Sequence, residues 1–247
     1  MASPRHHHEP APHPAPSHIP LAVRCTAELV GTAFFLAFIF GSGIQAIQLT
    51  DDAGIHLMAN SLTTALGLGA MILLLGPISG AHLNPAITLA VWWTSRKSGH
   101  GISSQAAVAY IIAQFVGAIA GAILTNAMFA FPLVDWATQD RSEGHQLLSE
   151  VVATGGLILL LFGLSRTGRT ERFAAVGVAS YVGAAIWFTS STGFANPALT
   201  IGRMFSDMFD GIEPSSVPAF IGMQIIGIVA ALAVGSLIFR SGDHGTG

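Results

Sequence analysis

Charged residues are scarce in this chain of 247 residues. Asp, Glu, Lys and Arg together make up 9% of it, whereas a soluble globular domain carries about 25%. Hydrophobic residues make up 51%, and this balance predicts a membrane protein. Because the net charge is only −3 and no basic stretch with interleaved aromatic residues occurs, we expect no nucleic-acid partner.

Reactive residues are also scarce. The single cysteine, Cys25, excludes an internal disulfide and a thiolate metal cluster. The chain contains no GxSxG, HExxH, CxxC or Walker sequence. We therefore expect no enzymatic activity, no cofactor and no metal site. Residues 1–20 are rich in Pro and His and lack apolar periodicity, so they are predicted to be a disordered, solvated tail. Weak metal binding by these histidines is the alternative.

Long apolar stretches dominate the rest of the chain. Residues 21–240 are predicted to form one membrane domain, and residues 241–247 a second disordered tail. A helix needs about 20 apolar residues to cross a bilayer. Six stretches meet this length, at about 22–47, 57–77, 104–130, 147–166, 172–192 and 216–240. Two further pieces, about 84–95 and 196–207, are too short to cross and are predicted to be re-entrant half-helices.

The tripeptide Asn-Pro-Ala begins both short pieces, at Asn84-Pro85-Ala86 and Asn196-Pro197-Ala198. Asn is a preferred helix N-cap, and Pro is tolerated at the first helical position because its missing N–H needs no partner there. Two half-helices that start near the middle of the bilayer would aim their positive dipole ends at a shared point.

The two halves of the chain repeat each other. Glu28-x-x-x-Thr32 recurs 122 residues later, the triplets are 112 residues apart, and Gln114-x-x-Gly117 recurs after 110. Repeat one covers about 21–130 and repeat two about 145–240. Because three spans per half is an odd number, the second copy enters from the opposite side, which predicts an inverted 3+3 repeat with a site between the halves.

The positive charges predict the orientation. With both termini in the cytoplasm, only two arginines lie outside, Arg141 and Arg203. This distribution agrees with the positive-inside rule.

The sequences SGAHLNPA at 79–86 and GFANPA at 193–198, together with the paired Glu-x-x-x-Thr helices, resemble the aquaporin (major intrinsic protein) family. The resemblance implies an all-α membrane protein, a right-handed bundle of six transmembrane helices plus two half-helices, assembled as a homotetramer with one pore per subunit. It implies that the triplets line the pore and that Glu28, Glu150 and His82 anchor the re-entrant loops. A proton-relay role for the two glutamates is the alternative from the residues alone.

The position after the second triplet departs from the family. Most members read Asn-Pro-Ala-Arg, whereas this chain has Leu199. Counting back from the triplets places the other selectivity-filter positions at Thr64, Ala184 and Gly193, or Phe194 if the loop is shifted by one. Such a ring predicts a wide, uncharged filter. Arg203 lies one helical turn further on. It is predicted either to attract solutes in an outer vestibule or to pair with Asp207.

An alkyl residue after the second triplet is similar to a bacterial subgroup associated with arsenic-resistance genes. That similarity implies a passive channel in the inner (plasma) membrane for arsenite, As(OH)₃, other metalloid hydroxides, glycerol-like polyols and water. The lipid bilayer and small neutral solutes are then the expected partners. A water-selective channel of the same fold is one alternative. A secondary transporter, which would also show inverted repeats and broken helices, is another.

Overall fold

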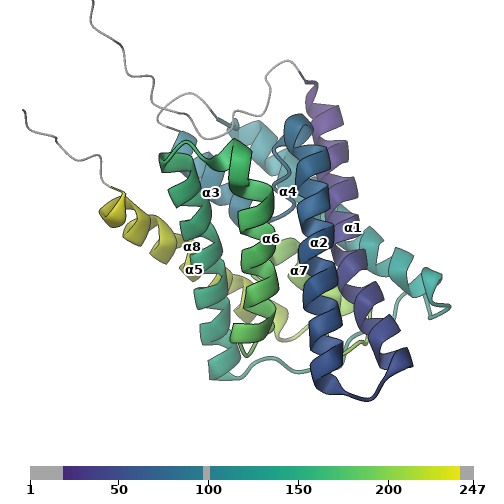
Figure 1. The fold of residues 1–247 in the computed structure, drawn as a ribbon. Helices are drawn as coiled ribbons and strands as arrows, with labels where there is room; N and C mark the ends of the chain where they lie inside the picture. Colours follow the sequence, from purple (N-terminus) through teal and green to yellow (C-terminus); the bar gives the residue numbers. More distant parts are fainter. Residues whose placement is uncertain (1–18, 97–100, 240–247) are drawn as a thin grey trace, which may run out of the picture.

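The computed structural model describes residues 19–96 and 101–239, and every regular element in these ranges is helical (Figure 1). The predicted tails lie almost entirely outside the described residues. The elements in order are α1 (Leu21–Leu49), α2 (Ala53–Ser79), α3 (Pro85–Ser95), α4 (Ser104–Met128), α5 (Gly144–Arg166), α6 (Thr170–Phe188), α7 (Pro197–Gly202), the 3-10 turn η1 (Arg203–Phe205) and α8 (Val217–Ile238).

The long helices match the predicted spans. Five of them, α1, α2, α4, α5 and α8, are long and apolar enough to cross a membrane. The sixth, α6, is shorter, with an apolar part at Phe173–Phe188, and runs alongside α2 in the bundle (Figure 1). It ends at Phe188 rather than at the expected residue 192. The chain is a multi-pass membrane protein.

The packing follows the inverted repeat. Helix α1 packs on α2 and α4, and α5 packs in the same way on α6 and α8. The short helices cross between the halves, because α3 contacts α8 and α7 contacts α4. The two repeats are therefore interlocked around the half-helices rather than placed side by side.

Glycines allow the closest helix contacts. On α4, a Cβ added at Gly117 or Gly121 would collide with the backbone carbonyl of Leu29 or Ala33 on α1. Gly227 on α8 meets the carbonyl of Val151 on α5 at the equivalent place in repeat two. Small residues at such positions let two backbones approach within a membrane, where van der Waals contact drives helix association.

Both half-helices begin as predicted. The side-chain oxygen of Asn84 accepts the N–H of Ala86 at 2.8 Å. That of Asn196 accepts the N–H groups of Ala198 and Leu199 at 3.0 and 3.2 Å. The second half-helix is shorter than expected: α7 has six residues and tightens into η1 at Arg203.

Candidate functional site

The loops that lead into the two triplets have a strained backbone, and the strain is repeated. Three residues of each loop have positive φ. They are Gly80, Ala81 and Leu83 in the first loop and Thr192, Gly193 and Ala195 in the second. Each non-glycine residue in this region costs about 1–3 kcal/mol, so the surrounding structure must compensate.

Glu28 supplies that compensation in the first loop. One carboxylate oxygen accepts the N–H of His82 at 2.9 Å and the hydroxyl of Ser79 at 2.6 Å. The other oxygen accepts the N–H of Leu83 at 2.6 Å and the amide of Gln114 at 2.8 Å. The buried carboxylate thus binds two loop amides that would otherwise have no acceptor.

Glu150 repeats this arrangement in the second loop. It accepts the N–H groups of Phe194 and Ala195 at 3.0 and 2.9 Å. It also accepts the hydroxyl of Ser191 at 2.7 Å and the amide of Gln224 at 2.6 Å. Both glutamates therefore hold loops. The two glutamines, Gln114 and Gln224, fix the orientation of the glutamates.

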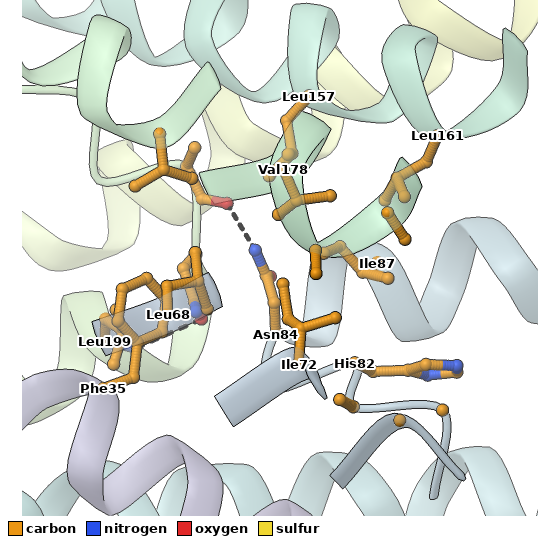
Figure 2. A pocket seen from close by; sticks show the side chains of 18 of the residues that line it. Phe35, Leu68, Ile72, His82, Asn84, Ile87, Leu157, Leu161, Val178 and Leu199 are labelled. Carbon is orange, nitrogen blue, oxygen red and sulfur yellow. Dashed lines mark hydrogen bonds between the residues drawn. The ribbon is translucent and has the colours of Figure 1, made fainter. Parts of the chain in front are cut away.

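The triplet asparagines also hold the two halves together. The Asn84 amide donates a hydrogen bond to the carbonyl of Ala195 at 2.8 Å (Figure 2). The Asn196 amide donates to the carbonyl of Leu83 at 2.9 Å. One N–H of each amide is therefore used between the repeats. Because an amide carries two such donors, one remains for another acceptor.

His82 lies where the first loop meets α3 and α4. Its Nδ1 is 3.1 Å from the hydroxyl of Thr88, and its ring packs edge-on against Tyr110. These contacts tie the loop to both helices, while the side chain also borders the cavity (Figure 2).

A cavity of about 580 Å³ runs between the repeats. Its wall is mostly apolar and comes from both halves (Figure 2). Most of the lining residues occur in pairs at the spacings of the repeat: Phe35 and Leu157, Ile39 and Leu161, Thr64 and Ala174, Leu68 and Val178, Ile72 and Val182, Gly76 and Ile186, Ala81 and Gly193, His82 and Phe194, Asn84 and Asn196, Ile87 and Leu199, and Val91 and Arg203. The cavity is therefore shaped by the inverted repeat itself.

The cavity has two distinct ends. We call the end lined by Thr64, Ile186 and Arg203 the Arg203 end. The opposite end, lined by the repeat partners Ala174, Gly76 and Val91, is the Val91 end. The two asparagines lie between them.

Most of the predicted filter residues border this cavity, but Ala184 does not. Thr64, Gly193, Phe194 and Leu199 all line it, so both alternatives for the loop position are lining residues. Ala184 is exposed on the outside of the bundle and corresponds in the repeat to Leu74, which is also exposed. Its prediction was wrong because the ungapped count misplaced the helical face. Val182 and Ile186, one turn apart, form the lining face of α6.

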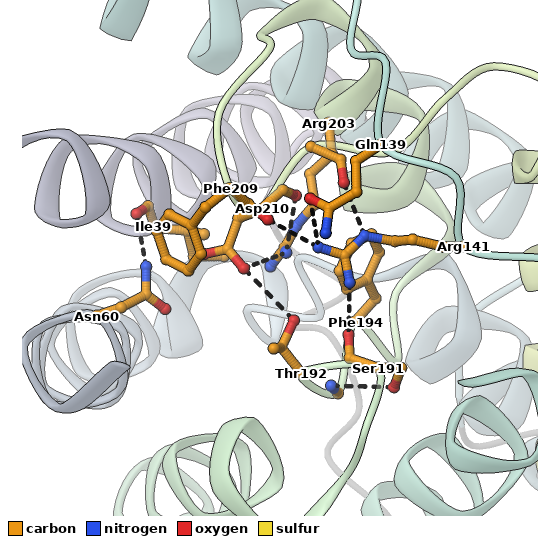
Figure 3. Close-up of polar contacts among 12 residues, drawn as sticks. Ile39, Asn60, Gln139, Arg141, Ser191, Thr192, Phe194, Arg203, Phe209 and Asp210 are labelled. Carbon is orange, nitrogen blue, oxygen red and sulfur yellow. Dashed lines mark hydrogen bonds and ion pairs between the residues drawn. The ribbon is translucent and has the colours of Figure 1, made fainter. Parts of the chain in front are cut away.

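Arg203 is buried at the Arg203 end and pairs with a different acid from the one expected. Its Nη1 lies 3.4 Å from a carboxylate oxygen of Asp210 and donates to the Asp210 carbonyl at 3.3 Å (Figure 3). Asp207 instead accepts the N–H and hydroxyl of Thr138. The helical spacing behind the Asp207 prediction fails because η1 ends at Phe205 and the chain is extended at Ser206.

Arg141 also lies beside Arg203 and Phe194, a position that the sequence did not predict. It comes from the α4–α5 connection and donates to the carbonyls of Gly211 and Phe209 at 2.7 and 2.9 Å (Figure 3). Its guanidinium lies 4.9 Å from the centre of the Phe194 ring, and that of Arg203 lies 3.8 Å from the same ring.

Burial lowers the pKa of Arg141 to about 10, although nearby Asp210 opposes the shift. Arg141 therefore stays charged at neutral pH. The only sequence signal was that Arg141 is one of the two arginines on the predicted outer side.

The chain resembles the same group of known proteins in sequence and in fold. Residues 17–195 match the sequence model of the family described as Major intrinsic protein. The chain is 41% identical over 214 residues to an aquaglyceroporin, AqpS, of Rhizobium meliloti, covering 87% of this chain and 89% of that protein. It is 31% identical to a probable aquaporin, AqpM, of Archaeoglobus fulgidus, covering 85% and 94%. The X-ray structure of the aquaglyceroporin from Plasmodium falciparum superposes with a TM-score of 0.65, at 20% identity, and covers 90% of this chain and 97% of that one.

Proposed function

Because the chain belongs to the major intrinsic protein family, we propose that it is a passive channel for small uncharged solutes. The observation that carries the proposal is the cavity between the repeats, which the two triplet asparagines border from opposite half-helices. An apolar wall with a few converging polar groups is typical of a path for small molecules.

The asparagines would provide the hydrogen bonds at the middle of the path. Each has one amide N–H beyond the one that bonds the opposite loop, and this second donor can meet the oxygen of a passing solute. The positive ends of the half-helix dipoles face the same point and disfavour cations. The path therefore suits neutral molecules that carry oxygen acceptors.

The filter favours solutes larger than water. Leu199 puts an uncharged side chain where most of the family has arginine, and the neighbouring positions Thr64 and Gly193 are small. We infer that glycerol-like polyols and trihydroxy species such as arsenite can pass together with water. The 41% identity to the Rhizobium meliloti protein described as an aquaglyceroporin supports this choice over a water-selective channel.

Orientation and assembly belong to the same proposal. Arg24, Arg96, Arg166 and Arg169 lie toward the Val91 end, whereas Arg141 and Arg203 lie at the other. By the positive-inside rule the Val91 end faces the cytoplasm, with both termini on that side of the inner (plasma) membrane. The exposed apolar faces of the helices would contact lipid or neighbouring subunits of a homotetramer.

The test is stopped-flow light scattering on proteoliposomes, with water, glycerol and arsenite measured side by side against empty liposomes. We expect faster entry of all three. If neither glycerol nor arsenite enters faster than into empty liposomes, the proposal fails. Faster water entry alone would instead identify a water-selective channel.

Leu199→Arg is the decisive variant. It should restore a bulky cation to the filter and suppress glycerol and arsenite more than water. Leu199→Met is the matched control, because it keeps an uncharged side chain of similar volume and should leave the ratio of glycerol to water permeability near that of the wild type. An unchanged ratio in Leu199→Arg would show that position 199 does not set selectivity.

A secondary transporter is the remaining alternative. It would need a group that binds a coupling ion, and the buried carboxylates are the natural candidates. Glu28 and Glu150 each already accept four hydrogen bonds from loop and glutamine donors. This occupancy favours the passive channel.

A further inference from the structure

The lining of the cavity breaks its repeat symmetry at the two ends. Along most of the wall, an apolar residue of one repeat corresponds to an apolar residue of the other, and Asn84 corresponds to Asn196. At the Arg203 end, however, Thr64 and Arg203 stand where the Val91 end has Ala174 and Val91. Thr64 and Arg203 are thus polar where their repeat partners are apolar, whereas the polar lining residues of the Val91 end are Ser165 and Thr170.

These two side chains have unused hydrogen-bonding groups. Among the residues that the structure describes, Thr64 Oγ1 and Arg203 Nε are buried polar atoms without a hydrogen-bond partner. Thr64 is 0% exposed and Arg203 3% exposed, and both border the cavity. A buried polar group left without a partner is unfavourable, so such groups in a cavity indicate a place where a ligand or water binds.

Both groups belong to the same level of the bundle. Ser61, one turn before Thr64 on α2, accepts a hydrogen bond from the indole of Trp187 at the end of α6. Gly193, in the loop that follows α6, packs against Ala185. The next residue, Phe194, lies against the guanidinium of Arg203.

The positive charge of Arg203 is balanced by the carboxylate of Asp210. Asp210 is 2% exposed and lies 3.4 Å from Arg203 Nη1, and the Thr192 hydroxyl donates to the same carboxylate oxygen at 3.4 Å (Figure 3). The guanidinium also stacks on Phe194. Arg203 is therefore oriented by Asp210 and Phe194, and its pair with Asp210 carries no net charge, while Arg141 on the same Phe194 ring keeps its own charge.

We propose that Thr64 and Arg203 form a binding site for the hydroxyl groups of a neutral polyhydroxy solute, with Asp210 cancelling the charge of the arginine. This inference rests on the proposed channel function. The Arg203 Nε–H can only donate, while the threonine hydroxyl can donate and accept, so together they match a molecule with two or more hydroxyls. Leu199, Phe194 and Ile186 complete an apolar surround. The site thus contains an arginine that is paired with aspartate, although Leu199 directly follows the second triplet.

Thr64→Val tests the site, because valine keeps the shape of threonine and removes the hydroxyl. In proteoliposomes the ratio of glycerol to water permeability should fall about 3- to 10-fold, the effect of losing one hydrogen bond. Arsenite, measured in a separate arm, should fall likewise if the site accepts metalloid hydroxides as well as carbon polyols. Thr64→Ser restores the hydroxyl and should restore the ratio. An unchanged ratio in Thr64→Val overturns the proposal.

Asp210→Asn tests the neutral pair. Removing the carboxylate leaves the guanidinium charge uncancelled, so nitrate currents absent from wild-type bilayers should appear, or nitrate should block glycerol entry. Because loss of a buried partner can prevent folding, Arg203→Met/Asp210→Asn is the second variant. It removes both charges of the pair and leaves Arg141 as the remaining charge, so it should lower the glycerol-to-water ratio and show no more nitrate effect than the wild type. A nitrate effect equal in wild type and Asp210→Asn, or an unchanged ratio in the double variant, contradicts the proposal.

These measurements distinguish a failure of the proposed channel function from a failure of the proposed binding site. If the wild-type protein passes neither glycerol nor arsenite, the proposed function itself fails. If the wild type passes them and the ratios of Thr64→Val and the double variant equal that of the wild type, only the binding site is refuted.

Discussion

The buried carboxylates of Glu28 and Glu150 stabilise the backbone of the two re-entrant loops. Glu28 and Glu150 each accept two loop amides, a serine hydroxyl and a glutamine amide. The loops they hold contain positive-φ residues such as Leu83 and Ala195, whose carbonyls accept the asparagine amides of the opposite repeat. At the scale of single residues, therefore, the geometry of each asparagine depends on a glutamate on another helix.

Replacing Glu150 with alanine should destabilise the protein strongly. Two loop N–H groups, Phe194 and Ala195, would lose their acceptor, at about 1–3 kcal/mol each. We expect a clear fall in the thermal unfolding midpoint in detergent, measured by tryptophan fluorescence. Glu143→Ala is the matched control, since that side chain is 69% exposed. Equal midpoints for the two variants would contradict the anchoring role.

Asn84→Asp should fold and leak cations. Aspartate keeps the oxygen that caps α3, but it loses the donor to the Ala195 carbonyl and adds a negative charge at the meeting point of the half-helices. We expect proton or sodium flux above that of the wild type, read with a pH-sensitive dye inside proteoliposomes. A variant that stays as cation-tight as the wild type would show that the barrier lies elsewhere.

At the scale of elements, glycine decides how closely helices approach. Helix α4 packs against α1 through Gly117 and Gly121, with no room for a side chain, whereas Gly222 on α8 faces open space. Glycine is therefore required for close packing at Gly117 and Gly121 but is not required at Gly222. The sequence shows small residues at helical spacing in both places, and only the packing tells them apart.

Gly117→Ala and Gly222→Ala should change stability in opposite directions. The first adds a methyl group against the Leu29 carbonyl and must separate α1 from α4. The second meets nothing within 4 Å, and alanine favours a helix over glycine by about 0.5–1 kcal/mol. Thermal unfolding in detergent checks both. A Gly117→Ala protein at least as stable as wild type would refute the close contact.

The whole molecule is two interlocked copies of one three-span unit. The half-helices cross between the copies, and the cavity wall takes one residue of each repeat pair from either side. Such symmetry places the cavity at the interface between the two copies. The departure from symmetry at Thr64 and Arg203 gives the two mouths of this path different chemistry.

Transport should therefore be symmetric in direction and independent of ion gradients. Glycerol permeability, measured by stopped flow, should be equal for inward and outward gradients and unaffected by an imposed proton or sodium gradient. The glycerol flux should also stay proportional to the glycerol concentration across the millimolar range. Uptake that accelerates with an ion gradient would favour the transporter alternative.

Local patterns in the sequence determined much of this protein. Apolar length, the capped triplets and the repeated Glu-x-x-x-Thr helices specified the spans, the half-helices and the inverted repeat, because helix formation and membrane insertion depend on neighbouring residues. Only the tertiary structure decided that Arg203 pairs with Asp210, that Arg141 enters the same site, and that Ala184 faces away from it. Those outcomes depend on where α7 ends, how the connections fold back and which face of α6 turns inward. Contacts between distant segments set these features, and residue spacing alone does not encode them.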